Sequence, residues 1–127
     1  MNGNQQNIKL LLAEDDAMLA ALLKFRLEKE GYAVLLCKDG KEVKEQLNSS
    51  LPDVIVCDIM MPYFSGIELV AHIRNDLRSQ LPIIMISSAG NEQNVLSAFE
   101  LGANDFLSKP ISPSELVVRL KREMSKV

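Results

Sequence analysis

Five short apolar segments, separated by stretches with helical spacing, constrain the fold of this chain more than any other feature. The segments cover residues 8–13, 32–37, 53–58, 82–87 and 104–109. The first four are nearly continuous apolar runs, which are typical of strands covered on both faces in a parallel sheet. The fifth, NDFLSK, is shorter and more polar, so we expect it to be an edge strand.

Helical patterns fill the intervals between these segments. Apolar residues at helical spacing mark the first and fourth helices: Leu19, Leu22, Leu23 and Leu27, then Val95, Leu96 and Phe99. Three pairs have capping-box spacing: Asp39 with Glu42, Ser65 with Glu68, and Ser112 with Glu115. Because strands and helices alternate five times, we predict an α/β fold with a doubly wound, five-stranded parallel sheet, (βα)5. Flavodoxin-like and Rossmann-like strand orders both fit this pattern.

Length and composition narrow the class of protein. A chain of 127 residues suffices for one domain with its own core. A net charge of −3 and the lack of a Lys/Arg-rich run argue against direct nucleic-acid binding. No apolar run is long enough to span a bilayer, and the polar start MNGNQQN has no signal-peptide core, so we expect a cytoplasmic protein. Cys37 and Cys57 are expected to be reduced and buried.

Polar residues stand where four of the five expected strands end. Glu14 and Asp15 follow the first, Asp58 ends the third, Ser87 ends the fourth and Lys109 ends the fifth. In a doubly wound sheet, ligands bind beyond the carboxyl ends of the strands. Crowded carboxylates repel one another unless a cation is present, and Mg²⁺ prefers such oxygen ligands. With a hydroxyl and an ammonium group beside them, these residues suit phosphoryl transfer to an aspartate nucleophile.

Each of these residues has a simpler role when it is taken alone. Asp16, next in the chain, suits the N-cap of the first helix, and Asp58 can cap a turn. Ser87 can bond to local backbone, and Lys109 can be an ordinary surface lysine. Their joint placement at the ends of different strands is what favours a functional site.

In their order and separation, four segments resemble the receiver domain of bacterial two-component response regulators. They are LLLAEDD, DVIVCDIMMPYFSG, LPIIMIS and GANDFLSKP. The resemblance covers residues 7–126 and implies a single receiver domain over residues 1–127, with the flavodoxin-like strand order 2-1-3-4-5. It also implies a phosphoacceptor switch of a phosphorelay, which is not an enzyme beyond its own phosphorylation and dephosphorylation.

The resemblance assigns roles to the residues at the strand ends. Asp58 matches the phosphoacceptor, which receives a phosphoryl group from a sensor histidine kinase or a histidine phosphotransfer protein. Glu14 and Asp15 match the acidic pair that binds Mg²⁺, and Asp58 and the backbone carbonyl of Met60 complete the protein ligands. Lys109 matches the lysine that pairs with the phosphoryl group.

The resemblance also implies how phosphorylation changes the surface. Ser87 matches the Ser/Thr whose hydroxyl contacts the phosphoryl group. Phe106 matches the aromatic switch position, where it can rotate inward but lacks the hydroxyl of a tyrosine. The Lys109–Pro110 peptide is typically cis in the family. The responding surface comprises the fourth helix, fifth strand and fifth helix, about residues 91–126, which would control a partner protein or effector domain.

Two further expectations concern hydrolysis and dimerisation. The positions linked to hydrolysis in the family hold Met60 and Ala89, whose side chains cannot hydrogen-bond an attacking water, so we predict slow self-dephosphorylation. Many DNA-binding members dimerise through the surface of residues 91–126, and Asp105 and Arg119 are candidates to pair across such a homodimer. Two origins stay open: a single-domain regulator, or a receiver cut from a longer protein.

Two functions of other classes compete with this interpretation. The first is a Mg²⁺-dependent phosphatase with an aspartyl-phosphate intermediate, which commonly has an acid/base aspartate two residues after the nucleophile. Met60 occupies that place and argues against it. The second is a nucleotide- or flavin-binding domain, which is weakened by the lack of a glycine-rich phosphate loop after the first strand.

Overall fold

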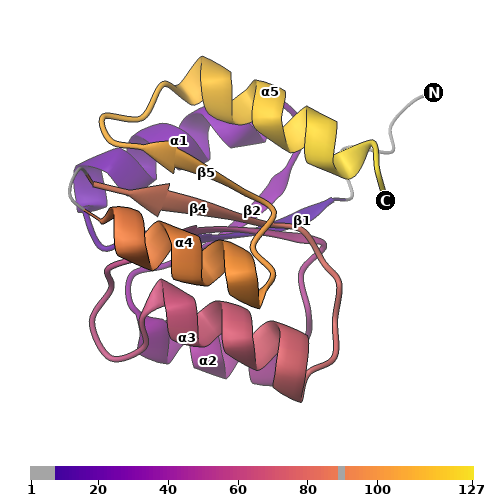
Figure 1. Ribbon diagram of the computed structural model, residues 1–127. Helices are drawn as coiled ribbons and strands as arrows, with labels where there is room; N and C mark the ends of the chain where they lie inside the picture. The colour runs from indigo at the N-terminus through magenta and orange to yellow at the C-terminus, as the bar shows by residue number, and fades with distance from the viewer. Residues whose placement is uncertain (1–7, 89–90) are drawn as a thin grey trace.

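The computed structural model describes residues 8–88 and 91–127, which form a parallel sheet between two layers of helices (Figure 1). The strands are β1 (Lys9–Ala13), β2 (Ala33–Cys37), β3 (Val54–Asp58), β4 (Ile83–Ser87) and β5 (Asp105–Ser108). Their order in the sheet is β2-β1-β3-β4-β5, and every neighbouring pair is parallel. The predicted fold and its flavodoxin-like strand order are therefore confirmed.

The helices cover both faces of the sheet. They are α1 (Ala17–Lys29), α2 (Gly40–Ser49), α3 (Gly66–Ala71), which continues as a π-helical turn over His72–Asp76, α4 (Glu92–Leu101) and α5 (Pro113–Met124). α1 and α5 lie on one face, and α2, α3 and α4 lie on the other (Figure 1). Each face has its own apolar core, because alternate side chains of the strands point to opposite sides. None of these helices, among the residues described, is long and apolar enough to cross a lipid bilayer.

Burial along the strands follows their place in the sheet. β3 and β4 are buried at every residue, as their continuous apolar sequences predict. β5 alternates between buried and exposed residues, which confirms the expected edge strand. The expectation that the segment over residues 32–37 is covered on both faces is wrong, because β2 forms the opposite edge. Leu35 and Leu36 of β2 are 41% and 36% exposed.

The helix starts follow the predicted caps, though only one forms a full capping box. Ser65 and Glu68 at α3 exchange both hydrogen bonds. Asp39 and Ser112 accept the backbone N–H at the third position of α2 and α5 without the reciprocal bond. Asp16 caps α1 as expected, accepting two backbone N–H groups. These caps start α1, α2, α3 and α5 beyond the strand ends that precede them, at the edge of the sheet where the polar residues gather.

Candidate functional site

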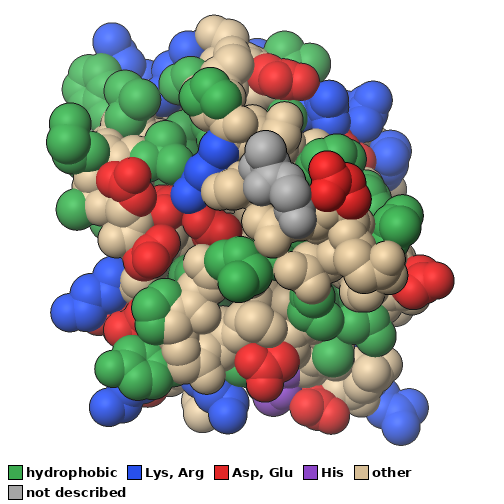
Figure 2. Space-filling view, turned by 60° about the vertical axis from the view of Figure 1, so that its left-hand side comes forward, with side chains coloured by type: hydrophobic (Ala, Val, Ile, Leu, Met, Phe, Trp, Pro, Cys, Tyr) green, Lys and Arg blue, Asp and Glu red, His purple; other side chains and the backbone are tan. Residues whose placement is uncertain are grey.

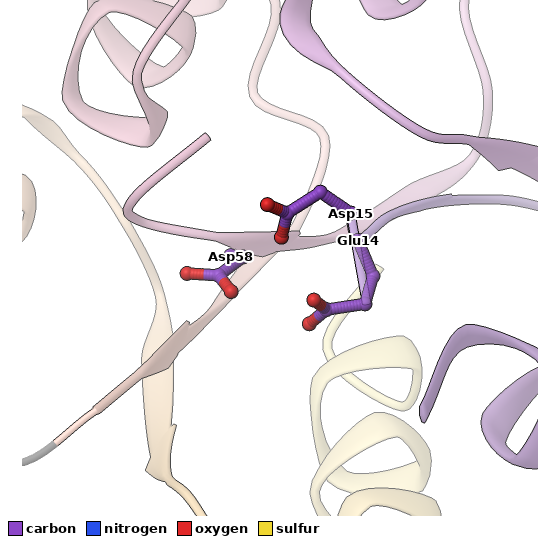
Figure 3. Close-up of side chains that lie close together, drawn as sticks. All are labelled: Glu14, Asp15 and Asp58. Atoms are coloured by element: carbon purple, nitrogen blue, oxygen red, sulfur yellow. The ribbon is translucent and has the colours of Figure 1, made fainter. Parts of the chain in front are cut away.

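Three carboxylates converge at the carboxyl ends of β1 and β3. Each of Glu14, Asp15 and Asp58 offers an oxygen within 4.8 Å of the others (Figure 3). Glu14 and Asp58 are only 1% and 4% exposed, whereas Asp15 faces solvent. The strands explain this convergence, since Ala13 of β1 pairs with Cys57 of β3 and both chains end at the same edge. On this edge, acidic side chains gather beside a basic one (Figure 2).

Lys109 supplies the positive charge of the cluster from the end of β5. Its Nζ donates to Asp58 Oδ2 at 2.7 Å and lies 3.4 Å from the carboxylate of Glu14. The lysine side chain keeps a quarter of its surface exposed, while both carboxylates are buried. The Lys109–Pro110 peptide is cis, as the resemblance implied. The ammonium group therefore joins the ends of β1, β3 and β5 in one charged cluster.

The electrostatics of the cluster follow from burial and proximity. Burial raises the pKa of Glu14, and the charge of Asp58 adds to this rise, although the backbone N–H of Asp16 at 2.9 Å opposes it. Burial also opposes the charged form of Lys109. The hydrogen bond and charge of Asp58, together with those of Glu14, outweigh that effect and raise the pKa of Lys109. Lys109 is therefore held as a cation beside three carboxylates.

The donor set fits a hard divalent cation such as Mg²⁺. Within the described part of the chain, Glu14 Oε1 is a buried oxygen that accepts no hydrogen bond, although Lys109 lies near it. A buried acceptor without a donor is costly, and a cation would satisfy it. Asp15 and Asp58 add two more carboxylates on the same side. Oxygen ligands in this number, one of them open to solvent, are typical of Mg²⁺ sites that keep several waters.

The loop after β3 holds Asp58 in a defined orientation. Asp58 Oδ1 accepts the backbone N–H of Met60 at 2.9 Å, which leaves Oδ2 to Lys109. Gly66, at the start of α3, donates its N–H to Ile59 O at 2.8 Å. A Cβ at Gly66 would lie 2.8 Å from Ile59 Cα and 3.0 Å from Asp58 O, so only glycine permits this close approach. Strand, loop and helix therefore position one carboxylate together.

Ser87 and Phe106 border a separate groove beside the acidic cluster. Ser87 is buried at the end of β4, one residue beyond Ile86, the partner of Asp58 in the sheet. Its hydroxyl donates to the Ser88 carbonyl at 3.0 Å. The groove has a volume of about 400 Å³ and extends from Ser87 to Phe106 along α4. It links the end of β4 to the surface of β5.

Phe99 is a contact of Phe106 that the sequence did not reveal. The rings meet edge to face, with centroids 5.9 Å apart, and Phe106 is half-exposed. The spacing of Val95, Leu96 and Phe99 predicted one helix, and α4 confirms it. All three line the groove, but only Val95 is buried, whereas Leu96 and Phe99 are exposed. In the sequence, the only signal for this contact was an aromatic residue at helical spacing. A residue buried in the core would have the same spacing, so the signal did not identify the contact.

Two other expectations have different outcomes. Asp105 and Arg119 pair within the same chain at 2.7 Å, and Arg122 joins them at 3.2 Å from Asp105. Both side chains therefore have partners within their own chain. This intramolecular pairing is an alternative to the expected pairing across a homodimer interface. Met60 has an exposed side chain near the site. Ala89, its partner in the hydrolysis prediction, lies outside the described residues.

Comparisons with known proteins agree with this geometry. The response regulator receiver domain family matches residues 10–121. The transcriptional regulatory protein PhoP of Bacillus subtilis is 36% identical over 115 residues, which is 91% of this chain and 48% of PhoP. For PhoB of Escherichia coli K12 the identity is 34%, with 94% of this chain and 52% of PhoB covered. The chain thus spans about half the length of these curated relatives.

A solved structure gives the same result in three dimensions. The receiver domain of the Francisella response regulator 1452 aligns with a TM-score of 0.85 and 34% identity. The alignment covers 94% of this chain and 98% of that domain. Sequence and structure therefore agree over nearly the same residues, and the chain belongs to the receiver domain family of two-component response regulators.

Proposed function

We propose that Asp58 is the phosphoacceptor of this receiver domain and that residues 1–127 form one such domain. The observation that carries this proposal is the pairing of a buried carboxylate at the end of β3 with the Lys109 ammonium at 2.7 Å. Asp58 has one oxygen oriented by the Met60 N–H and the other held by Lys109. A carboxylate fixed in this way loses little conformational entropy when it attacks phosphorus, which lowers the entropic cost of the reaction.

The chemical step is an in-line displacement at phosphorus. An oxygen of Asp58 forms the new P–O bond while the bond from phosphorus to the donor breaks, and the leaving group takes the electron pair of the broken bond and a proton from solvent. For the donors expected in a phosphorelay, a sensor histidine kinase or a histidine phosphotransfer protein, the leaving group is an imidazole. Lys109 is placed to follow the incoming charge, because its Nζ already lies beside the attacking carboxylate.

We infer that Glu14, Asp15 and Asp58, with the backbone carbonyl of Met60, hold Mg²⁺ in the working protein. The bound ion would neutralise charge on the phosphoryl oxygens during transfer. The buried oxygen of Glu14 that accepts no hydrogen bond supports this assignment, as does the exposure of Asp15, which leaves room for water. The Asp16 N–H and the Lys109 ammonium hold the Glu14 carboxylate in place.

The output surface is proposed to be the one formed by α4, β5 and α5. A phosphoryl group on Asp58 adds roughly −1.5 to −2 charges and strong acceptors close to Ser87. If the Ser87 hydroxyl leaves the Ser88 carbonyl for that group, the groove beside it changes shape, and Phe106 can move into it. Exposed apolar side chains on this surface, Leu96 and Val118 among them, would bind an effector or a second copy of the chain.

Phosphorylation by a small phosphodonor tests the proposal directly. With Mg²⁺ present, the chain should gain the mass of one phosphoryl group, and Asp58→Ala should gain none. Asp53→Ala is the matched control, because Asp53 precedes the same strand at its other end. Labelling of Asp58→Ala at the parental rate would refute the assignment.

Slow loss of the phosphoryl group is a separate expectation. Met60 cannot orient an attacking water, and Ala89 has no polar side chain. Replacing both, as Met60→Asn with Ala89→Glu, should accelerate dephosphorylation. An unchanged decay of the phosphorylated mass would contradict this reasoning.

The competing functions have less support. A phosphatase of the type considered would need an acid/base group at position 60, where the chain has methionine. The match to receiver domains offers no support for that activity. A nucleotide or flavin domain would need a phosphate loop after β1, where the chain instead has Glu14 and Asp15.

A further inference from the structure

The two edges of the sheet differ in how their outward backbone groups are satisfied. On β5, the outward N–H of Phe106 donates to the Asp105 carboxylate at 2.8 Å, and its carbonyl accepts from Arg119 at 3.4 Å. These two side chains occupy the positions that another strand would need. The β5 edge is therefore closed at Phe106 by its own chain.

The β2 edge is open by the same criterion. Ala33 donates its N–H to Ile8 O, and Cys37 O accepts from the Glu14 N–H, so the odd-numbered residues of β2 face β1. Because backbone direction alternates along a strand, the N–H and C=O groups of Val34 and Leu36 point away from the sheet. No residue in the described ranges hydrogen-bonds to these four groups.

The side chains along this edge are apolar on both faces of the sheet. Val34 packs against the core beneath α1, whereas Cys37 belongs to the core beneath α2. Leu36 therefore lies on the α1 side and Leu35 on the α2 side, and both are exposed. Residues 33–37 contain no charge and no proline, which are the usual protections of an edge strand. These residues therefore present no charge or proline that would oppose pairing with a further strand.

We propose that β2 pairs in antiparallel fashion with β2 of a second copy of this chain, about a two-fold axis at Leu35. In this register, the N–H and C=O of Val34 bond to the C=O and N–H of Leu36 in the second copy, and the reverse. All four outward groups of each copy are then satisfied, with none left over. The two Leu35 side chains lie directly opposite each other as a pair without mutual backbone hydrogen bonds.

The surroundings of the edge suit a second copy. The outward N–H and C=O groups of one β2 strand can pair with the same groups of an identical strand. An isologous two-fold interface requires this self-complementarity. The adjoining helix α2 carries two lysines and two glutamates, Lys41, Lys44, Glu42 and Glu45, so its net charge is zero and two copies do not repel. Pairing would also bury Leu35 and Leu36 of both copies.

This interface is independent of the proposed phosphorylation and output. β2 and β5 are opposite edges of the sheet, so the surface of α4, β5 and α5 stays free in the paired form. The carboxyl ends of the two sheets point in opposite directions, because the paired strands are antiparallel. Each acidic cluster therefore remains open to its donor. A dimer through β2 and one through α4, β5 and α5 can be separated by substitution.

Sedimentation equilibrium of the full chain, over micromolar to near-millimolar concentrations, tests the proposal. The parent chain should form dimers, and Leu35→Lys should remain monomeric, because it places like charges opposite each other. Leu22→Lys, an equally drastic change at an exposed residue of α1, should dimerise like the parent. Val118→Lys tests the alternative interface through α4, β5 and α5. Monomeric parent protein throughout, or a dimer lost in Val118→Lys but kept in Leu35→Lys, would overturn the proposal.

Two further variants distinguish loss of the dimer from loss of folding and test the register of the paired strands. Val34→Pro removes an outward N–H and part of the Val34 packing beneath α1. It should therefore lower the melting temperature modestly, keep a single cooperative transition and lose the dimer. Leu35→Cys should form an intermolecular disulfide on oxidation much faster than Gln80→Cys, an exposed residue near the start of β4. Equal cross-linking of the two cysteine variants, or a dimer unaffected by Val34→Pro, would count against pairing through β2.

Discussion

Replacing Lys109 by methionine should destabilise the fold, because it leaves two buried carboxylates without their cation. The Nζ of Lys109 lies 2.7 Å from Asp58 Oδ2 and 3.4 Å from Glu14. At an effective dielectric constant of about 20, the closer contact alone is worth roughly 6 kcal/mol of Coulomb attraction. Desolvation of the lysine offsets part of this, and its side chain stays a quarter exposed. We therefore expect the free energy of unfolding to fall by about 2–4 kcal/mol, near the cost of removing one partner of a buried pair.

Urea denaturation followed by circular dichroism, in buffer with EDTA, measures this loss. The control is Lys121→Met, which removes the same group from an exposed pair with Glu30 at 3.8 Å. Such surface pairs contribute at most about 1 kcal/mol, and the loss there should be small. The argument fails if Lys109→Met costs no more than Lys121→Met.

The same variant should respond more strongly to Mg²⁺. Without the ammonium group, Glu14, Asp15 and Asp58 form an uncompensated acidic cluster, and a divalent cation binding the folded state stabilises it by mass action. Adding Mg²⁺ should therefore raise the melting temperature of Lys109→Met by more than it raises that of the parent. An equal or smaller rise would show that the lysine does not compete with the cation for these carboxylates.

Three other predictions follow from the packing and charge of the described residues. Gly66→Ala should cost about 1–3 kcal/mol in urea denaturation and slow phosphorylation of Asp58, because its Cβ would press on the backbone of that loop; parental values of both would disprove the close approach. Burial raises the pKa of the Cys37 thiol to about 11, so near neutral pH a thiol reagent should label it only as the chain unfolds, and stability should decline as pH rises from about 9 towards 11; rapid labelling of folded protein would contradict this. Asp105→Asn should lose about 1–3 kcal/mol in urea denaturation, since it weakens the 2.7 Å bond to Arg119 inside one chain; a parental midpoint would show that the pair does not stabilise the monomer.

The fold was largely predictable because its signals are local. Continuous apolar runs such as residues 54–57 and 83–86 identify buried parallel strands without knowledge of their neighbours. The carboxyl ends of parallel strands share one edge, so the residues after those runs, among them Asp58 and Lys109, had to lie near one another. The roles proposed for them rested on resemblance, since neither spacing nor composition distinguishes a phosphoacceptor from a helix cap.

What the sequence by itself determined is therefore the alternation of elements and the gathering of charged residues at one edge of the sheet. The shorter and more polar fifth segment already indicated one edge of the sheet, but only the tertiary structure showed that Leu35 of β2 is exposed despite a sequence that reads as buried. The tertiary structure also decided that Asp105 bonds to Arg119 of its own chain, and that Phe99 contacts Phe106. The physical reason is the same in each case. The periodicity of apolar residues depends on residues a few positions apart in the sequence. Strand order and side-chain partners depend instead on contacts between segments far apart in the chain.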